Sequence, residues 1–244
     1  MAKQADATPT NPRGLRDLPF QLPQVTDAEK RRARRLAAAL AEHYPDAVCE
    51  LDFTSPHELL IATILSAQTT DAAVNRVTPA LFEAFPTPRA FADASPEAIE
   101  PYIKSIGLFR NKAKAVHAAM TTLVEEFDAE VPQNMADLLS LRGVARKTAS
   151  VVLGNSFNIN DGFVVDTHIH RLARRFGLID PEANVQQTER RLMALFPRKD
   201  WCELSHRLIW HGRRACQARG KACASHPICQ SFGVACDRRD INHD

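Results

Sequence analysis

Apolar residues recur every three or four positions over most of this chain, a spacing typical of amphipathic α-helices. Signals for helix starts agree with it: Thr26 and Glu29 form a potential capping box, and Ser-Pro or Thr-Pro pairs place proline at positions 56, 88 and 96. No segment shows the sustained alternation of apolar and polar residues that is typical of a strand. The pattern therefore predicts an all-α fold.

The helix that begins at Pro56 is unusual because apolar residues occupy almost its whole circumference over residues 59–65. A helix that is apolar all round lies in a protein interior, so we expect residues 56–68 to form a buried central helix. Glycine marks the expected ends of two later helices, at positions 107 and 212.

A second feature is a pair of short helices with a tight turn between them. Residues 135–139 predict one helix, Gly143 interrupts it, and residues 146–157 predict another with one apolar face. Such a turn directs backbone N–H groups outward at a helix start, where they and the positive dipole end can bind a phosphate without reading sequence. The natural polyanion for this helix-hairpin-helix is DNA.

Composition limits the remaining possibilities. With 244 residues, 45% of them hydrophobic, the chain can bury a substantial core, but its longest apolar run is far shorter than the roughly 20 residues of a membrane span. Residues 1–25 contain four prolines and lack the apolar run of a signal peptide, so we expect a disordered tail and a cytoplasmic, nucleoid-associated protein. A net charge of +2 means that any DNA surface must come from local clusters. One such cluster comprises Arg142, Arg146, Lys147, Arg171, Arg174 and Arg175.

The hairpin, Leu-Arg-Gly-Val-Ala-Arg-Lys-Thr-Ala over residues 141–149, resembles that of the endonuclease III family of helix-hairpin-helix DNA glycosylases. Lys147 and Asp166 match the lysine and aspartate with which that family does its chemistry. The chain departs from the family at Arg142, usually proline, and at Ala145, usually a second glycine. Because alanine with a positive φ costs about 1 kcal/mol, the hairpin either avoids that conformation or is strained.

The resemblance implies a catalytic role for this pair. A glycosylase must first rotate the base out of the duplex, after which an amine can attack C1′ of the sugar. Only a neutral amine is a nucleophile, and both the neighbouring Arg146 and the helix start disfavour an ammonium at Lys147. Asp166 is placed to cap the next helix and, ionised, to take a proton or balance a cationic sugar, although a purely structural cap is the alternative.

We therefore expect a base-excision-repair DNA glycosylase with AP lyase activity that removes oxidised pyrimidines and nicks the strand by β-elimination. The oxidised pyrimidines come from the resemblance alone. The alternatives are a monofunctional glycosylase for mismatched or alkylated bases, which Lys147 argues against, and a non-catalytic DNA-binding protein. The expected partner is double-stranded DNA with a damaged base or an abasic site, bound by a monomer.

The resemblance also implies DNA contacts outside the pair. Gln68 would enter the space left by the flipped nucleotide, and Leu108 would form an apolar wedge between base steps. For Gln68 the alternative is an ordinary solvent-facing helix end, and for the adjacent Phe109 it is core burial. Further expected DNA contacts are the hairpin residues Arg142, Gly143, Val144, Ala145 and Arg146. His168 and Arg171 are expected either to contact a phosphate or to occupy an ordinary surface position.

Four of the six cysteines lie close together near the C-terminus, at Cys216, Cys223, Cys229 and Cys236. Four thiols in a short loop suit an iron-sulfur cluster or zinc. The family carries a 4Fe-4S cluster here with spacings x6, x2 and x5, of which this chain keeps only the first, and His226 takes the third family position. We expect these four cysteines to bind 4Fe-4S, with zinc, or a mixed ligand set, as the alternative.

The resemblance finally implies two helical subdomains that flank a DNA-binding cleft. Residues 26–50 and 166–244 would form one of them, together with a C-terminal iron-sulfur loop. Residues 51–165 would form an inserted subdomain that contains the helix-hairpin-helix. Residues 1–25 would remain outside both as the disordered tail.

Overall fold

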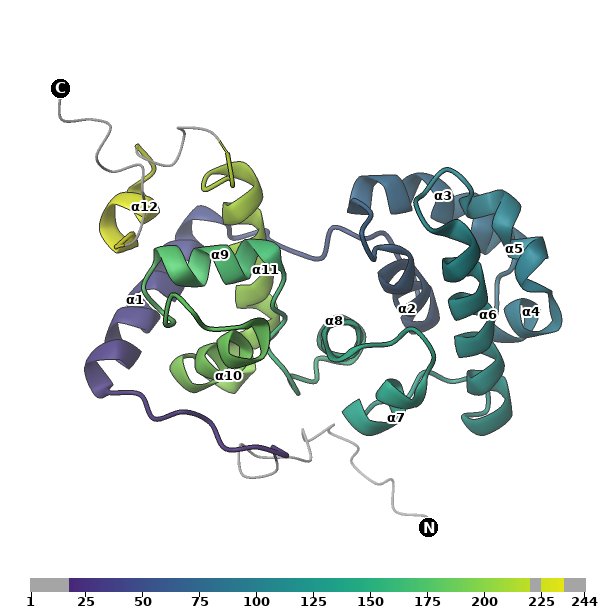
Figure 1. Cartoon of the computed structure of the whole chain (residues 1–244), viewed down its shortest axis with the longest axis horizontal. Helices are drawn as coiled ribbons and strands as arrows, with labels where there is room; N and C mark the ends of the chain where they lie inside the picture. Colours follow the sequence, from purple (N-terminus) through teal and green to yellow (C-terminus); the bar gives the residue numbers. More distant parts are fainter. Residues whose placement is uncertain (1–17, 220–224, 235–244) are drawn as a thin grey trace, which may run out of the picture.

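The structure, a computed structural model, describes residues 18–219 and 225–234 (Figure 1). Within these ranges every regular element is a helix and none is a strand, which confirms the predicted all-α fold. The α-helices are α1 (Asp27–His43), α2 (Pro56–Leu65), α3 (Asp71–Ala84), α4 (Pro88–Asp93), α5 (Pro96–Ile103), α6 (Phe109–Glu126), α7 (Met135–Ser140), α8 (Arg146–Phe157), α9 (Thr167–Arg175), α10 (Val185–Leu195), α11 (Trp201–Arg214) and α12 (Pro227–Phe232), with a 3-10 turn at Arg198–Asp200.

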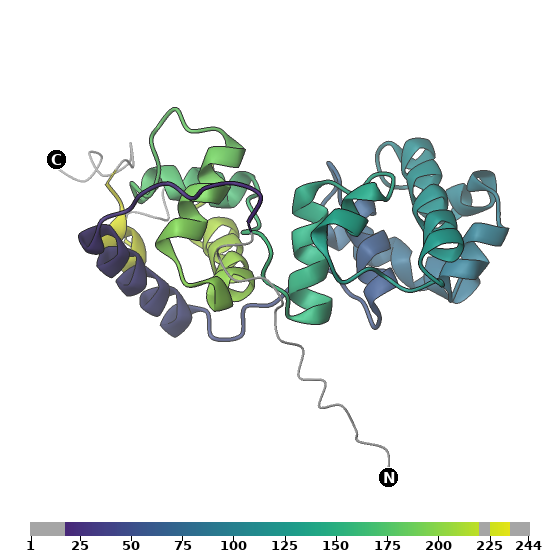
Figure 2. The ribbon, with the colours of Figure 1, turned by 90° about the horizontal axis from the view of Figure 1, so that it is seen from below.

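The helices gather in two groups around two separate cores. In Figures 1 and 2, α2 to α7 lie on one side, α1 and α9 to α12 on the other, and α8 runs between them. A first core is built from buried apolar residues between Leu51 and Leu153. A second core combines residues of α1 with buried residues between Phe163 and Cys229. The first and the last described helices, α1 and α12, therefore lie in the same half of the molecule.

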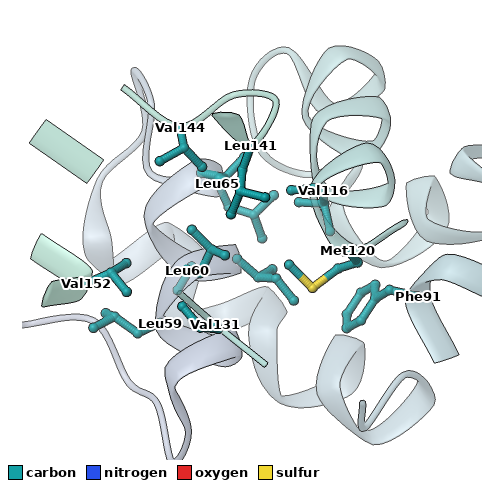
Figure 3. Packing of buried hydrophobic residues seen from close by; sticks show 14 of the residues in the cluster. Leu59, Leu60, Leu65, Phe91, Val116, Met120, Val131, Leu141, Val144 and Val152 are labelled. Carbon is teal, nitrogen blue, oxygen red and sulfur yellow. The ribbon is translucent and has the colours of Figure 1, made fainter. Parts of the chain in front are cut away.

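Helix α2 is the centre of the first core. All seven residues from Leu59 to Leu65 are buried, as expected for a helix that is apolar all round. In the view of Figure 3, Leu60 lies between Val152 of α8 and the side chains of Phe91 and Met120. The helix ends at Leu65, three residues earlier than predicted.

The predicted helix starts are confirmed, and at each of them the side chain of the N-cap residue accepts a hydrogen bond from the first turn. Thr26 and Glu29 form the expected capping box, and Ser55 accepts a hydrogen bond from the Glu58 amide. Thr87 and Ser95 cap α4 and α5 in the same way, each just before its proline.

The two predicted helix ends at glycine were wrong. Helix α5 ends at Ile103, where the Ile106 amide bonds the Ile103 carbonyl in a turn, and not at Gly107. Helix α11 continues through Gly212 to Arg214. A Cβ atom at Gly212 would lie 2.9 Å from Cβ of His168, so this glycine serves the close approach of α11 to α9 and not termination.

The predicted disordered tail was too long. Residues 18–25 lie against the second core through Leu18, Phe20, Leu22 and Val25, because apolar residues recur in this stretch. Residues 1–17 of the predicted tail lie outside the described residues. No described helix is both long enough and apolar enough to span a membrane.

Candidate active site

The hairpin joins α7 to α8 without strain at Ala145. Gly143 has a φ of +82°, and a Cβ atom there would lie 3.0 Å from Cβ of Ala115, so both conformation and space require glycine. Ala145 has φ −93° and ψ 168°, which any residue adopts. The Val144 side chain is buried, whereas Arg142, Gly143 and Ala145 are exposed. These three exposed residues present the hairpin to a ligand.

Helix α8 begins with an exposed Lys147 in its first turn. Among the described residues no side chain caps this helix, so its first amides lack the side-chain acceptor that most other described helices have at their N-cap. Arg146 is already engaged: its Nε lies 2.8 Å from Oε1 of Glu189, and its Nη2 donates to the Asp161 carbonyl at 3.1 Å. Its charge is therefore largely offset by Glu189.

Asp166 is the N-cap of α9, the helix that follows α8. Its Oδ1 accepts a hydrogen bond of 2.8 Å from the Ile169 amide, as predicted from the sequence. Asp166 and Lys147 line one open cavity of about 900 Å³, together with Gln68 and His168. The structure thus brings together a lysine at the start of one helix and an aspartate at the start of another.

A second carboxylate, Asp71, lies in the same cavity and was missed from the sequence. Burial raises the pKa of Asp71, the nearby Lys147 lowers it, and Asp166 raises it, which places the three charges within electrostatic reach of one another. Arg213 donates to Oδ2 of Asp71 at 2.7 Å and also pairs with Glu50. In the sequence Asp71 has only the signature of a first-turn acid, so nothing local marked it as a cavity residue.

The two predicted wedge positions share an uncommon backbone conformation. Gln68 has a φ of +53° and is exposed, and Leu108 has a φ of +59° with 56% of its surface exposed. Phe109 packs half-buried against the first core, which favours the core alternative for that residue. The exposed apolar side chain at this loop is therefore Leu108.

The remaining predicted DNA contacts differ in their accessibility. His168 lines the cavity. Arg171 lies beneath the C-terminal loop, where its Nη2 donates to the carbonyls of Gly212 and Cys216, each at 3.0 Å, and lies 3.3 Å from Nδ1 of His168. The guanidinium therefore connects α9 to the end of α11.

Two of the four predicted metal-binding cysteines lie within the described residues, and both are buried. Arg175 donates to Sγ of Cys216 at 3.1 Å, and Sγ of Cys229 lies 3.3 Å from Nε2 of His211. Hydrogen bonds from Cys229, His211 and Arg175 lower the pKa of Cys216 to about 3, despite burial. Ligand atoms of His211, His226 and Cys229 lie within 4.8 Å of one another, so this Cys/His group can hold a metal. Cys223 and Cys236 fall outside the described residues.

A small cavity of about 80 Å³ is lined by Lys147 and Asp166 and by the two remaining described cysteines, Cys49 and Cys202. Burial raises the pKa of Cys202 to about 12 and also raises that of Cys49, as expected for core thiols. Beside them, Nε2 of His206 bonds Oδ1 of Asn155 at 2.8 Å and so joins α11 to α8. Burial lowers the pKa of His206 to about 4.

Comparison with known proteins agrees with this geometry. The profile of the HhH-GPD superfamily base excision DNA repair proteins matches residues 61–198. The chain is 50% identical to endonuclease III of Synechocystis sp. over 196 residues, which are 80% of this chain and 89% of that protein.

Two solved structures agree in fold. A non-covalent endonuclease III–DNA complex matches with a TM-score of 0.81 and 38% identity, covering 89% of this chain and 98% of the other. A trapped endonuclease III–DNA covalent intermediate matches with a TM-score of 0.78 and 40% identity, covering 84% and 94%. The chain belongs to the HhH-GPD superfamily and, within it, to the endonuclease III family. It is a base-excision-repair DNA glycosylase and AP lyase.

Proposed function

We propose that Lys147 is the nucleophile of this glycosylase and lyase. The observation that carries the proposal is the shared cavity into which the starts of α8 and α9 bring Lys147 and Asp166. Nζ of Lys147 forms a bond to C1′ as the bond from C1′ to the base breaks, and the base leaves with the electron pair and takes up a proton. The nitrogen then loses a proton, and its lone pair displaces O4′ from C1′, which opens the sugar ring, lets O4′ take up a proton and leaves a protonated Schiff base. The Schiff base acidifies the C2′ protons, so that loss of one proton expels the 3′ phosphate by β-elimination.

Asp166 and its neighbours support this chemistry without forming covalent bonds. The Asp166 carboxylate, oriented by the Ile169 amide, takes the proton of the attacking amine or balances the cationic sugar. Asp71 places a further carboxylate near the amine. A trapped covalent intermediate of a relative with DNA supports the covalent step.

The substrate is duplex DNA that carries an oxidised pyrimidine or an abasic site. The uncapped start of α8 and the exposed hairpin residues suit a backbone phosphate. Gln68 and Leu108 enter the duplex, where they replace the displaced nucleotide and separate the base steps. The proposed contacts are Gln68, Leu108, Arg142, Gly143, Val144, Ala145, Arg146, His168 and Arg171.

We assign one subdomain to each of the two cores. Residues 51–165 act as one subdomain, and residues 26–50 with 166–244 as the other, with DNA in the cleft between them.

The buried, hydrogen-bonded thiol groups of Cys216 and Cys229 fit a thiolate-bound metal. These two, with Cys223 and Cys236, bind a 4Fe-4S cluster that cross-links the C-terminal loop, and zinc is the alternative. The enzyme works as a monomer on the nucleoid in the cytoplasm.

Borohydride trapping on a duplex with one abasic site tests the nucleophile. Wild type is expected to give a covalent protein–DNA band, and Lys147→Gln to lose it while still binding the duplex. Lys30→Gln, a lysine on α1, is the matched control and should keep the band. On a second duplex that carries an oxidised pyrimidine in place of the abasic site, base release without a covalent band would favour the monofunctional alternative. DNA binding with neither activity would favour the non-catalytic one.

The metal has its own test. A brown protein with a thiolate-to-iron absorption band and about four irons per chain supports the cluster. A colourless protein with one zinc per chain replaces it with the zinc alternative.

A further inference from the structure

Lys112 is a buried lysine that the catalytic chemistry does not use. It lies in the first turns of α6, only 5% of its surface is exposed, and its Nζ donates to Oγ1 of Thr69 at 2.6 Å. Burying an ammonium with so few partners costs free energy, and an apolar side chain of similar length would avoid that cost. Lys112 is therefore poorly explained by stability alone.

The contact partner of Lys112 lies directly beside Gln68. Thr69 accepts from Lys112 and its own hydroxyl donates to the Ala67 carbonyl at 3.4 Å, while its amide bonds the Ser66 carbonyl at 3.0 Å. These bonds fix the residues on both sides of Gln68, whose φ is +53°. The Lys112 ammonium thus anchors the loop that presents Gln68.

The backbone of Lys112 anchors the second wedge loop. Its amide donates to the Leu108 carbonyl at 3.0 Å, the first helical bond of α6. Leu108 is the N-cap of α6 and has a left-handed conformation, although N-caps usually adopt extended φ and ψ. One residue therefore contacts both loops, through its side chain on one side and its main chain on the other.

Both loops hold a non-glycine residue in the left-handed conformation. Gln68 lies three residues beyond the end of α2, and Leu108 precedes α6 as its N-cap. Each costs about 1 kcal/mol, so something must hold them in place. The other described non-glycine residues with positive φ are Asp128, Ala129 and Asn158, which lie one to three residues beyond the ends of α6 and α8.

We propose that Lys112 is a positioning residue that holds the Gln68 and Leu108 loops at a fixed separation, so that both enter duplex DNA as one wedge. The proposal rests on the proposed function, in which these two residues enter the duplex. It predicts that Lys112 matters only where a base must be displaced. Single-stranded DNA has no base stack to open, so the contacts of Lys112 with the two loops are not needed there.

The test compares two DNAs under single-turnover conditions: a duplex with one damaged pyrimidine or abasic site, and the same strand, single, with an abasic site. Lys112→Met should slow cleavage of the duplex about tenfold or more, as expected for a misplaced wedge, and change cleavage of the single strand less than about twofold. Lys114→Met, an exposed lysine of the same helix, should leave both rates unchanged.

If Lys112→Met does not fold, Thr69→Val serves as the second variant. It removes the acceptor oxygen, and valine has nearly the same shape as threonine. Thr69→Val should slow cleavage of the duplex and not of the single strand. The double variant should be no slower than the slower of the two single variants, because both substitutions remove the same contact. Equal losses on both DNAs, or no loss on either, would overturn the proposal. Failure of the proposed function would differ, because wild type itself would then cleave neither DNA.

Discussion

The two halves of the molecule are stabilised in different ways. Around α2 the core is apolar, and the ion pair internal to residues 51–145 is an exposed one, Arg110 with Glu100 at 4.0 Å. In the other half, arginine side chains cross between distant segments and donate to backbone carbonyls. These are Arg32 to Phe176 and Phe232, Arg171 to Gly212 and Cys216, Arg175 to Gln217, and Arg191 to Gln24.

This difference has a physical reason. The first half encloses one helix that is apolar on all sides, so burial alone fixes its neighbours. The second half joins residues 18–43 to segments after α8 and contains loop carbonyls, each of which needs a donor once buried. Arginine supplies several donors at the end of a long side chain. The two halves should therefore respond differently to mutation.

The largest expected effect is a cavity in the first core. Leu60→Ala removes a side chain with no exposed surface and should lower the free energy of unfolding by about 3 to 4 kcal/mol. The two tryptophans of the chain, Trp201 and Trp210, both lie on α11 in the other half. In urea, far-ultraviolet circular dichroism should therefore shift more than tryptophan fluorescence.

Leu139→Ala, at a residue 43% exposed on α7, is the matched control and should change neither curve measurably. Equal shifts of both probes in Leu60→Ala would mean that the two halves unfold as one unit. In that case the contrast between the cores would describe contacts and not separate stabilities.

The next effect belongs to the arginine contacts. Arg32 donates to the carbonyls of Phe176 and Phe232, both at 2.7 Å. Arg32→Met keeps much of the apolar stem but leaves two carbonyls unpaired, which should cost about 3 kcal/mol. Here tryptophan fluorescence should shift more than circular dichroism. The exposed neighbour Arg31→Met should have almost no effect, and an equal effect of both substitutions would contradict a specific role of the two bonds.

The same contrast explains what the sequence could predict. Helix starts such as Ser55-Pro56 and the cap at Asp166 are local, because the capping group lies within three residues of its partner. The buried helix α2 followed from its composition alone. The passage of α11 through Gly212 depends on His168, which lies far away in the chain, so the local signal was misleading.

The candidate site shows the same limit. Lys147 and Asp166 were predicted through a motif, and the structure places both at one cavity. The carboxylate of Asp71 and its partner Arg213 are 142 residues apart, and no periodicity relates them. The burial of Lys112 could not be predicted either, since only the folded chain brings Thr69 within reach of its ammonium.

The junction between the halves should be sensitive to pH through His206, whose pKa burial lowers from 6.5 to about 4. The unfolded chain binds a proton here below about pH 6.5, and the folded chain only below about pH 4. Stability is therefore full above pH 6.5 and is lost as the pH falls toward 4. Between pH 7 and pH 5 this histidine should account for about 2 kcal/mol of lost stability.

Urea unfolding of wild type and His206→Gln at several pH values measures that contribution. The difference in stability between the two proteins should shrink or reverse as the pH falls, because the variant lacks the buried imidazole. His117→Gln on α6 controls for the loss of a histidine elsewhere. A constant difference between pH 7 and pH 5 would show that His206 does not titrate in this range.

The smallest expected effect belongs to residues 18–25, which contact both halves of the molecule. The ring of Phe20 lies 5.3 Å from the guanidinium of Arg146, which begins α8, and 4.5 Å from that of Arg190 on α10. Helix α8 packs on α2, so Phe20 touches elements of both halves. Phe20→Leu keeps an apolar side chain but loses the ring face, and should cost about 1 kcal/mol. Because the contact spans the junction, fluorescence and circular dichroism should shift together, unlike in Leu60→Ala or Arg32→Met. Phe20→Tyr retains the ring and should keep wild-type stability, whereas a tyrosine variant as unstable as the leucine variant would show that the interaction of the ring with the two guanidinium groups does not hold residues 18–25 in place.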